Sequence, residues 1–139
     1  MTRIVTEAGF APDDWTEGFT PLEAFDAEPD APPRGLDLPC DVAPEALEGR
    51  LDGIAVIRVD FPVFSDGRGL TLGQHLRRLG FRGRLRARGH VLADQLMMVR
   101  RAGFDEVEIP DALAARQPEG DWTRCAQATP AGYLSRLKG

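Results

Sequence analysis

The stretch IAVIRVDFP at residues 54–62 is followed by TLGQHLRRLG at 71–80 and by RLRARG at 84–89. The first segment is β-branched and apolar, which predicts a largely buried strand over 54–59. In the second segment Leu72, Leu76 and Leu79 recur at helical spacing, and Thr71 with Gln74 predicts a capping box at the helix start. The third segment predicts a short strand over 84–88. A strand, a helix and a strand in this order favour a parallel pair with a right-handed crossover.

The same plan continues toward the C-terminus. A helix is predicted over 91–101, a strand over 106–109, a short helix over 111–116 and a last strand over 122–127. We therefore predict one small α/β domain of consecutive βα units with a mostly parallel sheet, for which a partial (half) barrel is one possible form. This predicted core covers 53–129, and a tail follows at 130–139.

Residues 1–52 differ in composition from the predicted core. They contain seven of the eleven prolines, and 13 acidic residues against three basic ones. This composition predicts a loosely structured N-terminal arm, with short strands near 3–5 and 36–38 and a short helix over 44–48.

The overall composition fits one globular domain. The chain has 139 residues, of which 42% are hydrophobic and 28% charged. It has no apolar run near the roughly 20 residues that span a bilayer, and its N-terminus lacks the apolar core of a signal peptide. We expect a cytoplasmic protein that does not associate with membranes.

The chain has two cysteines, Cys40 and Cys125, and no CxxC motif. Two isolated thiols cannot hold a structural zinc or an iron–sulfur cluster within one chain. The sequence also lacks a flavin or nicotinamide fingerprint and convincing haem ligands. We therefore predict no metal site and no cofactor.

Charge is unevenly distributed along the chain. Residues 66–101 contain nine arginines against two acidic residues, a net charge of +7, whereas the remainder has eight basic against twenty acidic residues, a net charge of −12. Such a block can bind anions or dock an acidic partner, or its arginines can pair internally with the surplus acids. Nucleic acid is not expected, because the block has a single aromatic residue and the acidic remainder would repel phosphates.

Each predicted core strand carries charge at alternate positions. These positions are Arg58 and Asp60, then Arg84, Arg86 and Arg88, then Glu106 and Glu108. Parallel strands usually bury both faces, so these charges either pair across a barrel-like interior or lie on an open face of the sheet. We expect Arg86 to pair with Asp60 or Glu108.

The loop Asp66-Gly67-Arg68-Gly69 is the first candidate binding site. Its glycines let the backbone approach a ligand, the following helix offers free N–H groups, and a guanidinium fits sulfate, sulfite, phosphate or carboxylate. The alternative is a tight turn in which Asp66 caps its own loop and Arg68 makes a salt bridge. Arg86 and Arg88 are further candidates for anion binding or partner docking.

A polar pocket is the second candidate site. Asp60 and His90 follow predicted strands, where catalytic groups of α/β sheets often lie, and Asp94 and Gln95 begin the next helix. No catalytic triad spacing or HExxH motif is present. A small enzyme of unknown reaction is therefore an open alternative.

Ordered, closely spaced residues over 54–109 resemble a bacterial family, the domain of unknown function family 934. The residues that carry the resemblance are Phe61-Pro62-Val63-Phe64-Ser65-Asp66-Gly67-Arg68-Gly69, Leu76-Arg77, Leu79-Gly80-Phe81, Gly83, Leu85-Arg86-Ala87, Gly89, Val91-Leu92, Asp94-Gln95-Leu96 and Gly103-Phe104-Asp105. Ala126-Gln127 stands where the family tends to end in a strand with a Tyr-Gln pair.

The resemblance implies a pathway rather than a reaction, because genes of the family commonly stand beside those of assimilatory sulfite reductase and the adenylyl-sulfate reductases. We therefore expect an accessory protein of assimilatory sulfate and sulfite reduction, with sulfite reductase or another enzyme of sulfate assimilation as its partner. A structural homodimer is the third alternative, since an incomplete barrel leaves edge strands that a second copy could cover.

Overall fold

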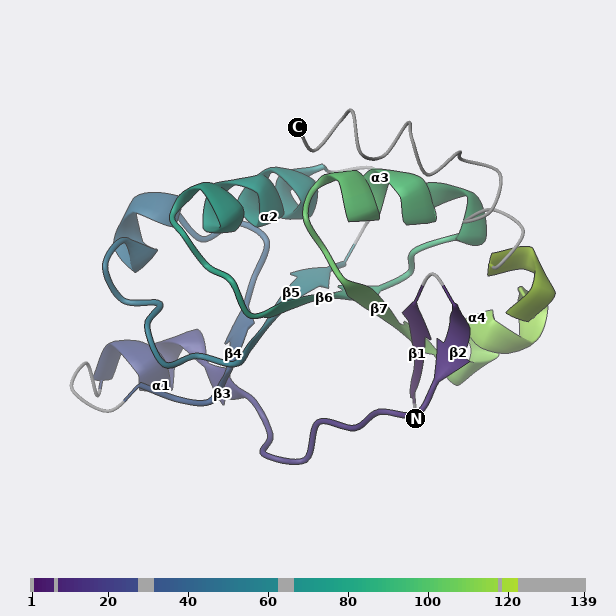
Figure 1. The fold of residues 1–139 in the computed structure, drawn as a ribbon, viewed down its shortest axis with the longest axis horizontal. Coiled ribbons are helices and arrows are strands. Elements are labelled where there is room, and N and C mark those ends of the chain that lie inside the picture. Colours follow the sequence, from purple (N-terminus) through teal and green to yellow (C-terminus); the bar gives the residue numbers. More distant parts are fainter. Residues whose placement is uncertain (1, 7, 28–31, 63–66, 118, 123–139) are drawn as a thin grey trace.

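The protein is described by a computed structural model that covers residues 2–6, 8–27, 32–62, 67–117 and 119–122. Its centre is an open seven-stranded sheet in the order β2-β1-β7-β6-β5-β4-β3 (Figure 1). The strands are β1 (Thr2–Thr6), β2 (Gly9–Ala11), β3 (Thr20–Pro21), β4 (Gly35–Leu38), β5 (Val56–Phe61), β6 (Arg84–Gly89) and β7 (Glu106–Pro110). Strands β3 to β7 run parallel, and β1 is antiparallel to both of its neighbours, β7 and β2. The predicted mostly parallel α/β domain is confirmed.

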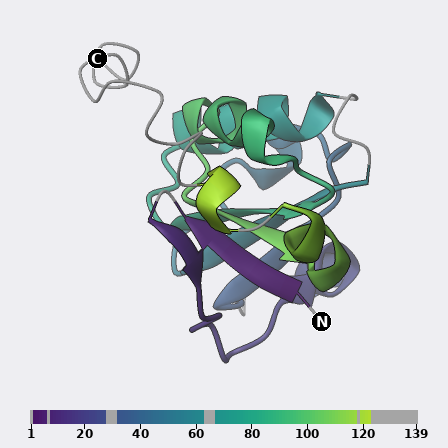
Figure 2. The same ribbon diagram turned by 90° about the vertical axis from the view of Figure 1, so that its right-hand side faces the viewer.

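The helices lie mainly on one side of a curved sheet. They are α1 (Leu22–Ala27), α2 (Arg68–Arg78), α3 (Leu96–Arg101) and α4 (Asp111–Arg116), with short 3₁₀ turns η1 (Pro44–Leu47) and η3 (Ala93–Gln95). Figure 1 shows α2 and α3 over the convex face, and Figure 2 shows β1 and β2 at one edge with α4 beside them. The sheet curves like part of a barrel wall and does not close.

The N-terminal segment contains the short strands predicted near 3–5 and 36–38, as β1 and β4. The structure pairs both with strands of the predicted core, which differs from a loosely structured arm. Strands β1 and β2 extend one edge beyond β7, where Ile4 lies opposite Glu108, and β3 and β4 extend the other edge beyond β5. The parallel register of Leu36 with Ile57 places both side chains in the same apolar layer. Pairing with distant strands, rather than local composition, therefore orders this proline-rich segment.

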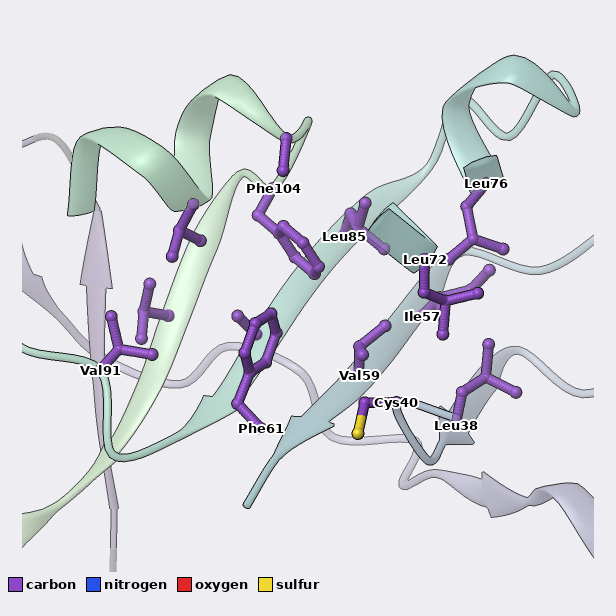
Figure 3. Packing of buried hydrophobic residues seen from close by; sticks show 14 of the residues in the cluster. Leu38, Cys40, Ile57, Val59, Phe61, Leu72, Leu76, Leu85, Val91 and Phe104 are labelled. Atoms are coloured by element: carbon purple, nitrogen blue, oxygen red, sulfur yellow. The ribbon is translucent and has the colours of Figure 1, made fainter. Parts of the chain in front are cut away.

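The apolar core lies between the convex face and helices α2 and α3 (Figure 3). Phe61 from β5 and Phe104 before β7 meet edge to face, with ring centroids 5.5 Å apart. A Cβ built on Gly69 would lie 2.6 Å from the ring of Phe61, and one on Gly73 would overlap the ring of Phe104. These two glycines, one helical turn apart on α2, let the helix pack directly on the aromatic pair.

Arg77 fastens the C-terminal end of α2 to the sheet. Its guanidinium donates hydrogen bonds to the carbonyls of Gly103, Phe81 and Gly83, at 3.0, 3.1 and 2.8 Å, and to the carboxylate of Asp105 at 2.9 Å. One of the nine arginines of the basic block therefore holds the fold together.

Two local predictions need correction. Helix α2 begins at Arg68 rather than Thr71, because Gly67 adopts a left-handed φ of 75° that turns the chain into the helix, and Thr71 donates to the carbonyl of Gly67 instead of capping. Trp122, predicted to begin a last strand, closes a helical turn over 119–122. The rest of that predicted strand and the predicted tail at 130–139 lie outside the described residues.

Substituting Gly73 by alanine tests the packing of α2. Alanine is a better helix former than glycine by about 1 kcal/mol, so propensity alone predicts stabilisation. Because the added methyl overlaps the Phe104 ring, we expect Gly73→Ala to lower the free energy of unfolding by about 1–3 kcal/mol in urea titrations. Gly120→Ala, where the Cβ meets open space, is the matched control. Equal or greater stability of Gly73→Ala would contradict the packing.

Candidate functional site

The concave face of the sheet is built around a buried arginine. Arg86, in the middle of β6, has no solvent-exposed side-chain surface. Its Nε donates to Glu106 at 2.5 Å, its Nη1 to Glu108 at 2.9 Å, and its Nη2 to Asp13 at 3.1 Å. Glu106 and Glu108 are themselves 6% and 4% exposed. The expected pairing of Arg86 with Glu108 is confirmed, and Arg86, Glu106 and Glu108 pair inside the fold.

Two further arginines extend this network along the concave face. Arg58 holds both oxygens of Asp37, at 2.6 and 2.7 Å, and reaches Glu108 at 3.2 Å. Arg84 bonds Glu106 at 2.7 Å. Burial lowers the pKa of each of these arginines, but the hydrogen bonds and charges of their carboxylate partners outweigh it and raise the pKa. The network is therefore fully charged on the arginine side.

Residues 12–19, which we call the strap, cross the concave face between β2 and β3 (Figure 1). Asp13 bonds Arg86 and Asp14 pairs with Arg84 at 2.9 Å. The ring of Phe19 lies over the guanidinium of Arg58, 4.0 Å from its centroid. The strap covers the charged network and joins the two edges of the sheet.

Gly35 allows the strap to pack directly against the sheet, because it has no side chain at the contact. A Cβ on this residue would overlap the carbonyl oxygen of Gly18 and lie 3.0 Å from the indole nitrogen of Trp15. The same indole nitrogen donates to the Gly18 carbonyl at 2.7 Å, which closes the strap into a turn.

A cavity of about 480 Å³ lies at the carboxyl edge of the sheet, between the segment after β4 and the start of α2. One wall consists of Gly67, Arg68, Thr71, Leu72 and His75 from α2 and its N-cap. The opposite wall consists of residues 40–44. The site therefore brings a guanidinium, a hydroxyl and an imidazole to one side of a cavity.

Helix α2 orients its positive end toward this cavity. The first helical hydrogen bond runs from the N–H of Thr71 to the carbonyl of Gly67, so the helix itself supplies no acceptor for the N–H groups of Arg68, Gly69 and Leu70. Gly67 carries no side chain that could cap them. The positive end of the helix dipole adds to the charge of Arg68.

Cys40 and Asp41 form part of the site that sequence reasoning missed. The side chain of Cys40 is buried and Asp41 is exposed. Both follow β4, whose carboxyl end lies beside that of β5 in the parallel sheet. The strand predicted near 36–38 could have indicated these residues, because they follow its carboxyl end. Since residues 1–52 were assigned to an arm, that end was not considered as a place for site residues.

The structure separates the other predicted site residues. Arg86 is enclosed by carboxylates, so its predicted role in docking or anion binding is corrected to a structural one. Asp60 and Arg88 lie side by side at the carboxyl ends of β5 and β6, 3.6 Å apart. Asp66 lies outside the described residues.

The residues of the predicted polar pocket differ in exposure and contacts. His90 and Asp94 are exposed, and the side chain of Gln95 accepts a hydrogen bond from the N–H of Leu92 at 2.8 Å, which caps the turn η3. Gln95 therefore has a local structural role, and Asp60 lines a cavity with Asp37 and Arg88.

The described part of the chain contains no group of three or more histidine, cysteine, aspartate or glutamate side chains placed to hold a metal ion. It also contains no helix that is long and apolar enough to cross a membrane.

One comparison with known proteins gave a match. The model of a family described as "Bacterial protein of unknown function (DUF934)" matches residues 35–133, which is most of the chain. No curated protein and no solved structure matches the chain. The match covers β4 to α4 and both walls of the 480 Å³ cavity.

Replacing Arg86 by methionine tests the buried network. The substitution leaves Glu106 and Glu108 as buried carboxylates without their main partner. We expect the free energy of unfolding in urea to fall by about 3–5 kcal/mol. Arg116→Met, at an exposed position on α4, removes the same charge and should change stability by less than about 0.5 kcal/mol. A loss below 1 kcal/mol on the same scale for Arg86→Met would overturn the central role of this residue.

Asp13 makes the stability of the strap depend on pH. Burial raises the pKa of Asp13, but hydrogen bonds from Arg86 and from the N–H of Trp15, with the charges of Arg86 and Arg84, hold the pKa below its usual value. A carboxylate with a lowered folded pKa stabilises the protein above its unfolded pKa, about 3.9, and loses that contribution as the pH falls through the folded pKa.

We therefore expect Asp13→Asn to destabilise the protein at neutral pH, and its difference from the unsubstituted chain to shrink as the pH falls below about 4. Urea titrations across pH measure both effects. Asp52→Asn is the control for removal of an exposed negative charge. A difference that stays constant across this range would rule out the Asp13–Arg86 contact as its source.

Proposed function

The chain belongs to the family described as bacterial protein of unknown function (DUF934), and on that premise we propose that it is an oxyanion-binding accessory protein of assimilatory sulfate and sulfite reduction. The observation that carries the proposal is the 480 Å³ cavity, where Arg68, Thr71 and His75 line the wall at the N-terminus of α2. The pathway is the one that the resemblance implies from its neighbouring genes.

Sulfite and sulfate suit this wall for electrostatic reasons. A guanidinium can bind two oxygens of such an anion at once, and the N–H groups of a helix start provide further donors. The hydroxyl of Thr71 and the imidazole of His75 can supply additional hydrogen bonds. Asp41 lies on the opposite wall and repels anions, so the oxyanion should bind on the α2 side.

The reduction of the sulfur oxyanion would be carried out by a partner enzyme. We propose sulfite reductase, or another enzyme of sulfate assimilation, as that partner. Among the described residues Arg78 and Arg82 are exposed and form no ion pair, so they are the arginines of the basic block available to dock an acidic surface. We assign the docking role to these two arginines in place of Arg86, because the guanidinium of Arg86 is enclosed.

Substituting Arg68 by alanine tests the oxyanion site. In calorimetric titration with sulfite and with sulfate, we expect Arg68→Ala to weaken binding by about tenfold or more, because one charge-assisted bidentate contact is lost. Asp41→Asn should strengthen binding, since it removes a repelling charge from the cavity. Arg116→Ala, far from the cavity on α4, is the matched control and should bind as the unsubstituted protein does.

The cellular role is tested separately. A strain whose only copy carries Arg68→Ala should grow on cysteine but poorly on sulfate as the sole sulfur source. Affinity purification of the protein from sulfate-grown cells should recover sulfite reductase with its visible absorbance, and Arg78→Ala with Arg82→Ala should reduce that recovery. Normal growth of the Arg68→Ala strain on sulfate, with a folded variant, would reject the proposed function.

A further inference from the structure

A second cavity lies at the mouth of the concave face, by which we mean the end of that face at the carboxyl ends of the parallel strands. It has a volume of about 230 Å³ and opens at the carboxyl ends of β4, β5 and β6. Its polar lining consists of Glu23, Asp37, Asp60 and Arg88. The cavity shares no lining residue with the 480 Å³ cavity.

Asp60 and Arg88 have unused hydrogen-bonding capacity. Their closest atoms are 3.6 Å apart, and their side chains are 46% and 42% exposed. Within the part of the chain that the structure describes, neither side chain has a hydrogen bond. The same alternation places Arg58 and Arg86 deeper on this face, and their carboxylate contacts are 2.5–3.3 Å long. The Asp60–Arg88 ion pair at the mouth is therefore loose, that is, without a hydrogen bond, whereas Arg58 and Arg86 are hydrogen-bonded to their carboxylates.

Asp37 completes the floor of this cavity without competing for a ligand. Both of its oxygens are held by Arg58, so its charge is compensated. The other charged groups that line the cavity are the guanidinium of Arg88, the carboxylate of its ion-pair partner Asp60, and the carboxylate of Glu23. Glu23 is exposed near the start of α1 and forms no ion pair with the described residues.

We propose that this mouth cavity binds a small zwitterion of the amino-acid class. The ligand carboxylate would bind Arg88, and its ammonium group would bind Asp60 with Glu23. A simple anion would meet Arg88 but also the carboxylates of Asp60 and Glu23, and a simple cation would meet the guanidinium. A ligand with both charges can pair with both residues at once, because its carboxylate contacts the guanidinium of Arg88 and its ammonium group contacts the carboxylate of Asp60.

The size and the remaining walls restrict the ligand further. A cavity of about 230 Å³ has room for a single small amino acid. Pro21, Leu22, Leu38 and Pro39 form its apolar lining, which can contact a short side chain. Glycine, alanine, serine and cysteine are amino acids of the right size.

The test compares matched small molecules by titration of the ¹⁵N-labelled protein in NMR. The probes are glycine, L-alanine, L-serine and L-cysteine, with propionate and ethylamine as the single-charge counterparts of alanine. We expect amino acids to shift the amide signals of residues near Asp60 and Arg88, and propionate and ethylamine to bind at least about tenfold more weakly.

Variants assign the binding to the cavity. Arg88→Gln and Asp60→Asn should each weaken amino-acid binding by about tenfold or more and leave sulfite binding at the other cavity unchanged. Arg116→Gln is the matched control, and circular dichroism with urea titration verifies that each variant folds. Amino acids that cause no shifts, propionate that binds as tightly as alanine, or a folded Asp60→Asn with unchanged affinity would each overturn the proposal. None of these outcomes depends on the oxyanion site.

Discussion

The buried guanidinium of Arg86 is the constraint on which the rest of the structure depends. A charged group without solvent contact must be fully paired, and Arg86 meets this demand with two glutamates from β7 and one aspartate from the strap. These carboxylates fix the register of β6 against β7. They also draw residues 12–19 across the concave face, which links strands at opposite edges of the sheet.

This internal pairing changes the meaning of the charge distribution. The basic block between residues 66 and 101 suggests a cationic surface, yet Arg77, Arg84 and Arg86 point their guanidinium groups at carbonyls and carboxylates of the fold. The acidic N-terminal segment supplies part of the compensating charge through Asp13 and Asp14. The acidic N-terminal segment and the basic block therefore form ion pairs with each other in the folded protein. Fewer arginines than the sequence suggests can bind ligands or partners.

The carboxyl edge of the parallel strands has two different cavities. One lies toward the helices and is lined by the start of α2, and the other lies on the concave side above the ion-pair network. Such an edge is where open α/β sheets usually bind ligands, because the loops and helix starts converge there. The charge patterns differ, with a cationic helix end at one cavity and a mixed set of charges at the other. The two proposed ligands follow from that difference.

The sequence by itself determined the βα order, the apolar faces of the core elements and the alternation of charge along β5, β6 and β7, because these depend on local periodicity. It also predicted Gly67 and Arg68 as residues of a candidate binding loop. Only the tertiary structure decided that residues 2–21 complete both edges of the sheet, that Arg86 is enclosed, and that Cys40 and His75 line one cavity. These features depend on contacts between residues far apart in the chain, on which local composition has no bearing.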